Sequence, residues 1–151
     1  MTINLESIRN DLQWLRGEDG VVPAAHAEEV LGRVLSPLFR SEGLEVSPSP
    51  GNPDLQFDLV AHTPARGPDR VQVRVVIEYK HHGGGRPIGV DEVDNLIARI
   101  GPAPPYQRAM LIGQFGFTAA ARSRARDQEP VRIEVLDLDG IEAWIRRSHR
   151  L

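Results

Sequence analysis

Two strand-like runs separated by a turn-rich stretch constrain the fold of this chain more than any other feature. The runs span residues 55–62 and 71–80, and the stretch between them contains Pro64, Gly67 and Pro68. Proline and glycine mark turns, so we expect a β-hairpin. If the hairpin is symmetric about Pro68, Asp58 lies directly opposite Glu78.

Side chains alternate along both runs and separate an apolar face from a polar face. The apolar set is Leu55, Phe57, Leu59, Ala61, Val71, Val73, Val75, Ile77 and Tyr79. The polar set is Gln56, Asp58, His62, Gln72, Arg74, Glu78 and Lys80. This alternation is typical of a half-buried antiparallel pair, and it places Lys80 on the same face as the two carboxylates.

Carboxylates that face each other across a sheet destabilise it unless a cation lies beside them. Lys80 could be that cation, and so could a metal ion, because Mg²⁺ prefers carboxylate, water and phosphate oxygens. In the metal interpretation Asp58 and Glu78 hold Mg²⁺ or Mn²⁺, and the Tyr79 carbonyl adds a ligand. Lys80 then positions the attacking water or stabilises charge on a phosphate. A solvated face with casually paired charges fits the pattern equally well.

The rest of the chain predicts helices and strands around this hairpin. Helices are expected over residues 3–15, 23–39, 90–100, 118–127 and 140–148, and short strands over residues 44–46, 108–113 and 131–136. Pro37 is expected to kink or shorten the second helix. The resulting order of elements is α, α, β, β, β, α, β, α, β, α. It indicates an α/β fold with a mixed sheet covered by helices on both sides.

Composition narrows the class of protein. With 151 residues the chain corresponds to a single domain, in which residues 1–22 form a helical extension before a core of residues 23–151. There is no cysteine for a thiolate site, and no apolar run approaches the roughly 20 residues that span a bilayer. We therefore expect a cytoplasmic protein without a membrane partner. A net charge of −3 argues against a general polyanion binder.

Several segments together resemble the PD-(D/E)xK nuclease superfamily, and within it the catalytic domain of Mrr-type restriction endonucleases. The matching stretch runs from Glu28 to about Trp144 and includes residues 57–61, 76–80, 88–93, 110–112, 116–121 and 133–137. The resemblance implies a restriction-endonuclease-like, three-layer α/β/α fold with a mixed central sheet. It also implies a metal-dependent endonuclease that hydrolyses DNA phosphodiester bonds with a metal-activated water.

The resemblance further assigns roles to matched residues. Asp58 and Glu78 are implied to be metal ligands and Lys80 the catalytic lysine. Glu28 is implied to be a helical acid that completes or orients the metal shell, although Glu29 competes for this role. Many relatives of this type carry Gln at the position of Glu78, so a glutamate favours a metal-competent site.

Five further residues near the predicted site are candidates for contact with nucleic acid: His81, His82, Arg86, Gln114 and Thr118. The simpler interpretation is an exposed loop for the histidines and a helix N-cap for Thr118. Because one active site cuts one strand, cleavage of a duplex suggests a homodimer. The acidic charge leaves room for a protein partner that supplies targeting. It also leaves room for a different class of function, a catalytically silent module with this fold that binds nucleic acid or protein.

Overall fold

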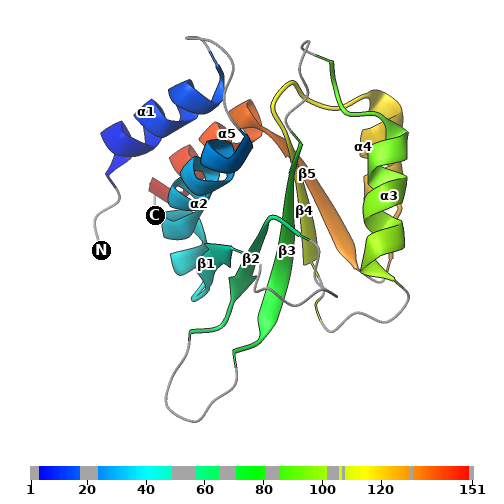
Figure 1. Cartoon of the computed structure of the whole chain (residues 1–151), viewed down its shortest axis with the longest axis horizontal. Coiled ribbons are helices and arrows are strands. Elements are labelled where there is room, and N and C mark those ends of the chain that lie inside the picture. The colour runs from blue at the N-terminus through cyan, green and yellow to red at the C-terminus, as the bar shows by residue number, and fades with distance from the viewer. Residues whose placement is uncertain are drawn as a thin grey trace.

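The fold is seen in a computed structural model that describes residues 4–17, 24–48, 57–64, 71–80, 86–101, 106, 108–129 and 131–149 (Figure 1). The elements follow the order predicted from the sequence. They are α1 (Leu5–Leu15), α2 (Ala24–Arg40), β1 (Glu45–Pro48), β2 (Leu59–His62), β3 (Val73–Lys80), α3 (Val90–Ile100), β4 (Arg108–Gly113), α4 (Ala119–Arg126), β5 (Arg132–Asp137) and α5 (Leu138–His149).

The strands form one mixed sheet in the order β1-β2-β3-β4-β5. The first three strands pair antiparallel, and β3, β4 and β5 pair parallel. Helices α3 and α4 are the crossovers that parallel pairing requires. Lys80, Gly113 and Asp137 pair across the last rows of these three strands, so the strands end at one common edge of the sheet.

The hairpin has the predicted register where its strands are regular. Leu59 pairs with Ile77, Val60 with Val76 and Ala61 with Val75. An irregularity after Ala61 shifts the pairing beyond it. Asp58 lies one residue before β2, and continuation of the register places it opposite Glu78.

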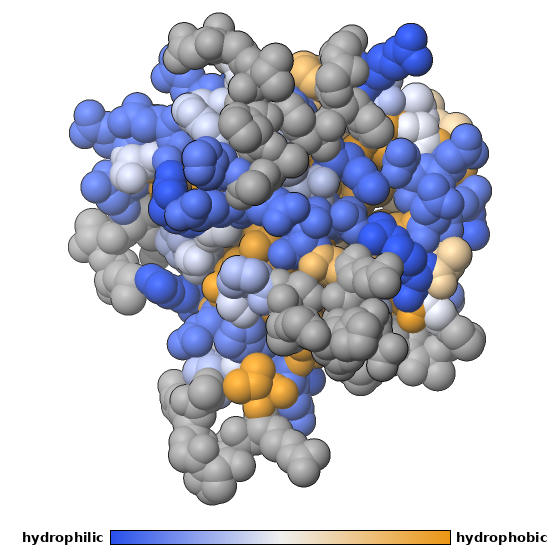
Figure 2. Space-filling model, in the orientation of Figure 1, coloured by the Kyte–Doolittle hydropathy of each residue, from blue (hydrophilic) through white to orange (hydrophobic). Residues whose placement is uncertain are grey.

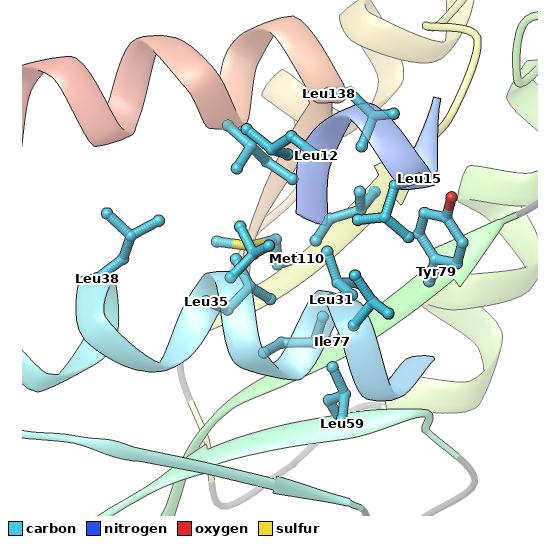
Figure 3. Close-up of a cluster of buried hydrophobic side chains, with 14 of the residues drawn as sticks. Leu12, Leu15, Leu31, Leu35, Leu38, Leu59, Ile77, Tyr79, Met110 and Leu138 are labelled. Carbon is cyan, nitrogen blue, oxygen red and sulfur yellow. The ribbon is translucent and has the colours of Figure 1, made fainter. Parts of the chain in front are cut away.

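Helices cover both faces of the sheet, which gives the three-layer α/β/α arrangement expected (Figure 1). Helices α1, α2 and α5 lie on one face, and their leucines surround Ile77 and Met110 of the sheet (Figure 3). Helices α3 and α4 lie on the other face and form a second core. Its members are Phe57, Val60, Val76, Ile88, Val93, Leu96, Ile100, Tyr106, Ala109, Leu111, Phe117, Ala121, Ala125, Val131 and Ile133.

The second core corrects the expectation of a half-buried hairpin with a solvated polar face. Val60 and Val76 lie on that face and are buried, because α3 and α4 pack over it. Phe57 also joins the second core rather than the side of Leu59, because it precedes β2 and does not follow the strand alternation. Glu78 and Lys80 therefore lie on a largely covered face, where a charged group needs a partner.

Two further features bear on the predictions for the helices. Helix α2 continues through Pro37 to Arg40, so the expected shortening there is wrong. Proline removes one hydrogen bond, and the buried Leu38 and Phe39 hold the last turn against the core. Helix α1 contributes Ile8, Leu12 and Leu15 to the first core.

The surface in the same view is mainly hydrophilic, with small separate hydrophobic areas (Figure 2). Within the described residues, no helix combines the length and apolar character needed to cross a membrane.

Candidate active site

Glu78 is the one charged side chain that is buried in the described part of the chain, with 7% of its surface exposed. It occupies the third-last position of β3. Alternation along the strand sends its neighbour Tyr79 into the first core, where burial raises the pKa of the tyrosine to about 12. Glu78 therefore points to the opposite face, toward α3.

Asp58 is tied to the same part of β3 by a backbone contact. The Tyr79 amide donates a hydrogen bond of 2.8 Å to Asp58 Oδ2. This bond holds the carboxylate at the start of β2 beside the end of β3. The local fold thus joins Asp58 and Glu78, which lie twenty residues apart in the sequence.

Helix α2 brings a third carboxylate to this point. The side chain of Glu28 is half-buried, and burial together with the charge and hydrogen bonding of Asp58 raises its pKa to about 6. Glu29 instead leaves 69% of its side chain exposed and pairs with Arg33 at 3.9 Å. Of the two glutamates that the sequence left open, the structure places Glu28 next to Asp58.

The pKa of Glu78 reflects both its burial and the nearby Asp58 carboxylate. Burial is the largest cause that raises its pKa to about 7, followed by hydrogen bonding to Asp58 and the charge of Asp58. Arg99 acts in the opposite direction and lowers the pKa. Glu28 and Glu78 thus both contact Asp58, and at neutral pH the cluster attracts protons or another cation.

Two residues of α3 that sequence reasoning did not assign pair with the functional candidates on β3. Arg99 forms an ion pair with Glu78. Glu92 lies with its Oε2 3.5 Å from Lys80 Nζ, and both side chains are about a quarter exposed. Glu92 and Arg99 are seven residues apart, which puts them on one side of a helix two turns from each other. That spacing was the available signal, but it does not reveal which strand the helix faces.

The guanidinium of Arg99 lies against one oxygen of the Glu78 carboxylate. Glu78 Oε2 is buried and has no hydrogen-bond partner among the described residues, although the guanidinium lies against it. The positive charge of Arg99 lowers the pKa of Glu78 and so favours its ionised form.

The oxygen atoms of these side chains are of the type that binds a hard divalent cation. All three acidic side chains offer carboxylate oxygens, which Mg²⁺ and Mn²⁺ prefer over nitrogen or sulfur. Burial, followed by the nearby Asp58 carboxylate, raises the pKa of both Glu28 and Glu78, so a cation at this point would be favoured. However, no group of three acidic or histidine side chains in the described ranges is arranged to hold a metal ion. A metal ion at Asp58 and Glu78 would have two carboxylate ligands and would need other oxygens to complete its shell, which is usual for Mg²⁺.

The residues predicted to contact nucleic acid have different surroundings. His81 and His82 lie outside the described residues, and Arg86 is exposed. The Gln114 side-chain amide donates to the carbonyl oxygens of Leu15 and Arg16 at 3.0 and 3.2 Å. Gln114 therefore closes the C-terminal end of α1, a role that its place after a strand did not indicate.

Thr118 has the structural role that its sequence context favoured. Its Oγ1 accepts a hydrogen bond of 3.1 Å from the Ala121 amide and caps α4. Contact of Thr118 with nucleic acid stays a prediction.

Three comparisons relate this arrangement to known proteins. A family model described as restriction endonuclease, of the Mrr catalytic type (Mrr_cat), matches residues 26–145, a range that contains Glu28, Asp58, Glu78 and Lys80. The chain is 30% identical over 139 residues to "Uncharacterized protein y4cE" of Sinorhizobium fredii, covering 91% of this chain and 35% of that protein.

Among solved structures, the chain is similar to the "DNA modification-dependent restriction endonuclease AspBHI", with a TM-score of 0.62 and 16% sequence identity. The similarity covers 97% of this chain and 37% of that one. The chain thus spans about a third of the length of both proteins. The structural likeness shows a shared restriction-endonuclease fold.

Proposed function

The chain belongs to the Mrr catalytic family of restriction endonucleases, and from this premise we propose that it is a metal-dependent endonuclease that hydrolyses DNA phosphodiester bonds. The observation that carries the proposal is the contact of Glu28 and Glu78 with Asp58 at the end of β3, with Lys80 two residues further along the strand. A buried carboxylate in contact with a second carboxylate costs folding free energy, and a functional site gives a reason for it.

Each residue has a proposed role. Asp58 and Glu78 hold Mg²⁺ or Mn²⁺, with the Tyr79 carbonyl as a further oxygen ligand. When bound, the ion would polarise the phosphodiester and lower the pKa of a bound water. Lys80 orients the attacking water or stabilises phosphate charge, and Glu28 orients Asp58 from α2.

The substrate and assembly belong to the same proposal. DNA is proposed because the family comprises restriction endonucleases. Arg86 is exposed and is proposed to contact the DNA backbone. A homodimer would supply the second active site that cleavage of both strands requires. A protein partner is proposed to supply targeting, because a chain with a net charge of −3 attracts DNA weakly by itself.

Cleavage of plain and methylated plasmid DNA by the purified chain tests the proposal. With Mg²⁺ or Mn²⁺ we expect cleavage that chelation abolishes, and that Asp58→Ala, Glu78→Gln or Lys80→Met lowers by about a hundredfold or more. Glu28→Gln should also lower the rate, whereas the matched variant Glu29→Gln should cleave as the wild type does. Cleavage that persists in Asp58→Ala would contradict the assigned site.

A second candidate function is a nuclease-fold module that binds nucleic acid or protein without catalysis. The ion pair between Arg99 and Glu78 favours it, because a cation already neutralises one proposed metal ligand. Calorimetry with Mn²⁺ separates the two functions. A silent module should show no binding that depends on Asp58.

A further inference from the structure

Arg99 makes two contacts that fix it at the proposed metal site. Its guanidinium forms an ion pair with Glu78, and its Cζ lies 5.5 Å from the centroid of the Phe57 ring. Phe57 immediately precedes Asp58 in the chain. Arg99 therefore contacts the segments that carry both proposed metal ligands.

We propose that Arg99 is a built-in counter-cation that neutralises Glu78 in the metal-free protein and competes with a divalent ion for this carboxylate. The inference rests on the proposed metal-dependent function. It adds that metal binding includes an exchange of cations, in which the guanidinium leaves Glu78 as the ion arrives. The same contact then limits how tightly the free protein holds metal.

Burial explains why Glu78 needs such a counter-cation. Only 8% of its side chain is exposed, and it also contacts Asp58. A buried carboxylate without a cation is costly, and a guanidinium keeps its charge at every physiological pH. Arg99 thus allows this carboxylate to be kept in the fold before any metal is present.

Arg99 is more exposed than Glu78, and this difference makes exchange of the guanidinium for a metal ion feasible. Glu78 is fixed on a central strand, whereas 31% of the Arg99 side chain is exposed on a helix. An arginine side chain is long and can keep its stem packed while its head group moves into water.

Lys80 does not substitute for Arg99 in this role. Its Nζ lies 3.5 Å from Glu92 Oε2, two helical turns from Arg99. Helix α3 therefore supplies one counter-ion for Glu78 and a different one for Lys80. Removal of Arg99 should change the charge at Glu78 and leave the pair between Lys80 and Glu92 in place.

Calorimetric titration with Mn²⁺ at one fixed pH tests the inference on the full chain. Arg99→Gln should bind Mn²⁺ about tenfold more tightly than the wild type, because one positive charge beside the ligands is removed. The metal-free variant should melt at a lower temperature, and saturating Mn²⁺ should raise its Tm by more than it raises that of the wild type. Arg124→Gln is the matched control, since Arg124 pairs with Asp94 on the helices of the same layer at 3.0 Å.

Asp58→Ala, alone and combined with Arg99→Gln, separates failure of this inference from failure of the proposed function. Equal or weaker binding by Arg99→Gln, with binding that still depends on Asp58, overturns the inference alone. No Asp58-dependent binding in either background overturns the metal-dependent function as well. If Arg99→Gln binds Mn²⁺ and the wild type binds none, Arg99 competes with the metal strongly enough to exclude it from Glu78.

A measurement on the wild type covers the case in which Arg99→Gln does not fold. The side-chain Nε resonance of Arg99 should move during a Mg²⁺ titration with the same midpoint as the calorimetric binding curve. The Arg124 resonance should stay in place. An Arg99 resonance that does not respond to bound Mg²⁺ overturns the exchange.

Discussion

Glu78 combines two properties at the scale of a single residue that ordinary surface glutamates lack. It is buried on a central strand, and its carboxylate contacts Asp58. Both raise its pKa, from 4.5 to about 7, against the opposing effect of Arg99. A protein that gains nothing from this carboxylate would be more stable with a neutral residue here.

The contribution of Glu78 should make the metal-free protein less stable as the pH rises from 4.5 to 7. The folded state keeps the proton in this window and the unfolded chain releases it, so stability present below pH 4.5 is lost by pH 7. The free energy of unfolding of the wild type, relative to Glu78→Gln, should fall by on the order of 2 kcal/mol across the window.

Urea unfolding at a series of pH values, with a chelator present, measures this difference. Glu29→Gln, on the exposed side of α2, serves as the control and should run parallel to the wild type. A constant difference between wild type and Glu78→Gln would show that the carboxylate has an ordinary pKa. Saturating Mg²⁺ should reduce the difference, because a bound cation favours the ionised form of Glu78 in the folded state.

At the scale of the elements, one amide side chain joins α1 to the edge of the sheet where the proposed site lies. Gln114 directly follows β4, and its backbone amide donates to the Lys80 carbonyl at 3.4 Å. Its side chain bonds the last carbonyls of α1, which are otherwise unsatisfied at a helix end. Helix α1 is thereby fixed to the ends of β3 and β4.

Gln114→Ala should therefore destabilise the protein by about 1–3 kcal/mol, since two carbonyl groups lose their partner. Hydrogen exchange should accelerate in the last turn of α1 more than in α3. Gln128→Ala is the matched control, because its side-chain bonds are local: its nitrogen donates to the Glu129 carbonyl and its oxygen accepts from Arg124 at 3.2 Å. Unchanged stability with weakened DNA binding would instead favour the predicted nucleic-acid role of Gln114.

Periodicity and turn residues predicted the elements because local signals determine them. The order of helices and strands and the regular part of the hairpin register are confirmed. The sequence of the hairpin did not predict that its polar face is buried, since α3 and α4, which cover that face, lie later in the chain.

The site was predictable only in part for the same reason. Asp58 and Glu78 are related by strand register, which can be read from the sequence. Glu28 and Glu29 point about 100° apart on a helix, so only packing decides which approaches the strands. Arg99 reaches Glu78 through the docking of α3, which no local pattern shows.

At the scale of the whole molecule, the layers converge on one edge of the sheet. Helix α2 brings Glu28 from one layer, the hairpin brings Asp58 and Glu78, and α3 brings Arg99 and Glu92 from the opposite layer. The core on each face therefore positions part of the site. A change in how either layer packs should alter the charge balance around Glu78.

The described residues of each chain form one such site, so one bound chain should cut one strand at a time. With supercoiled plasmid and Mg²⁺, we expect nicked circles at low protein concentration and a growing share of linear DNA as the concentration rises. The steep rise is expected because the proposed homodimer brings two sites to one duplex and forms by mass action. Gel analysis of early time points measures both products, with Asp58→Ala as the inactive control. A ratio of linear to nicked DNA that does not change with protein concentration would contradict dimer-dependent cleavage, while leaving the assignment of the single site intact.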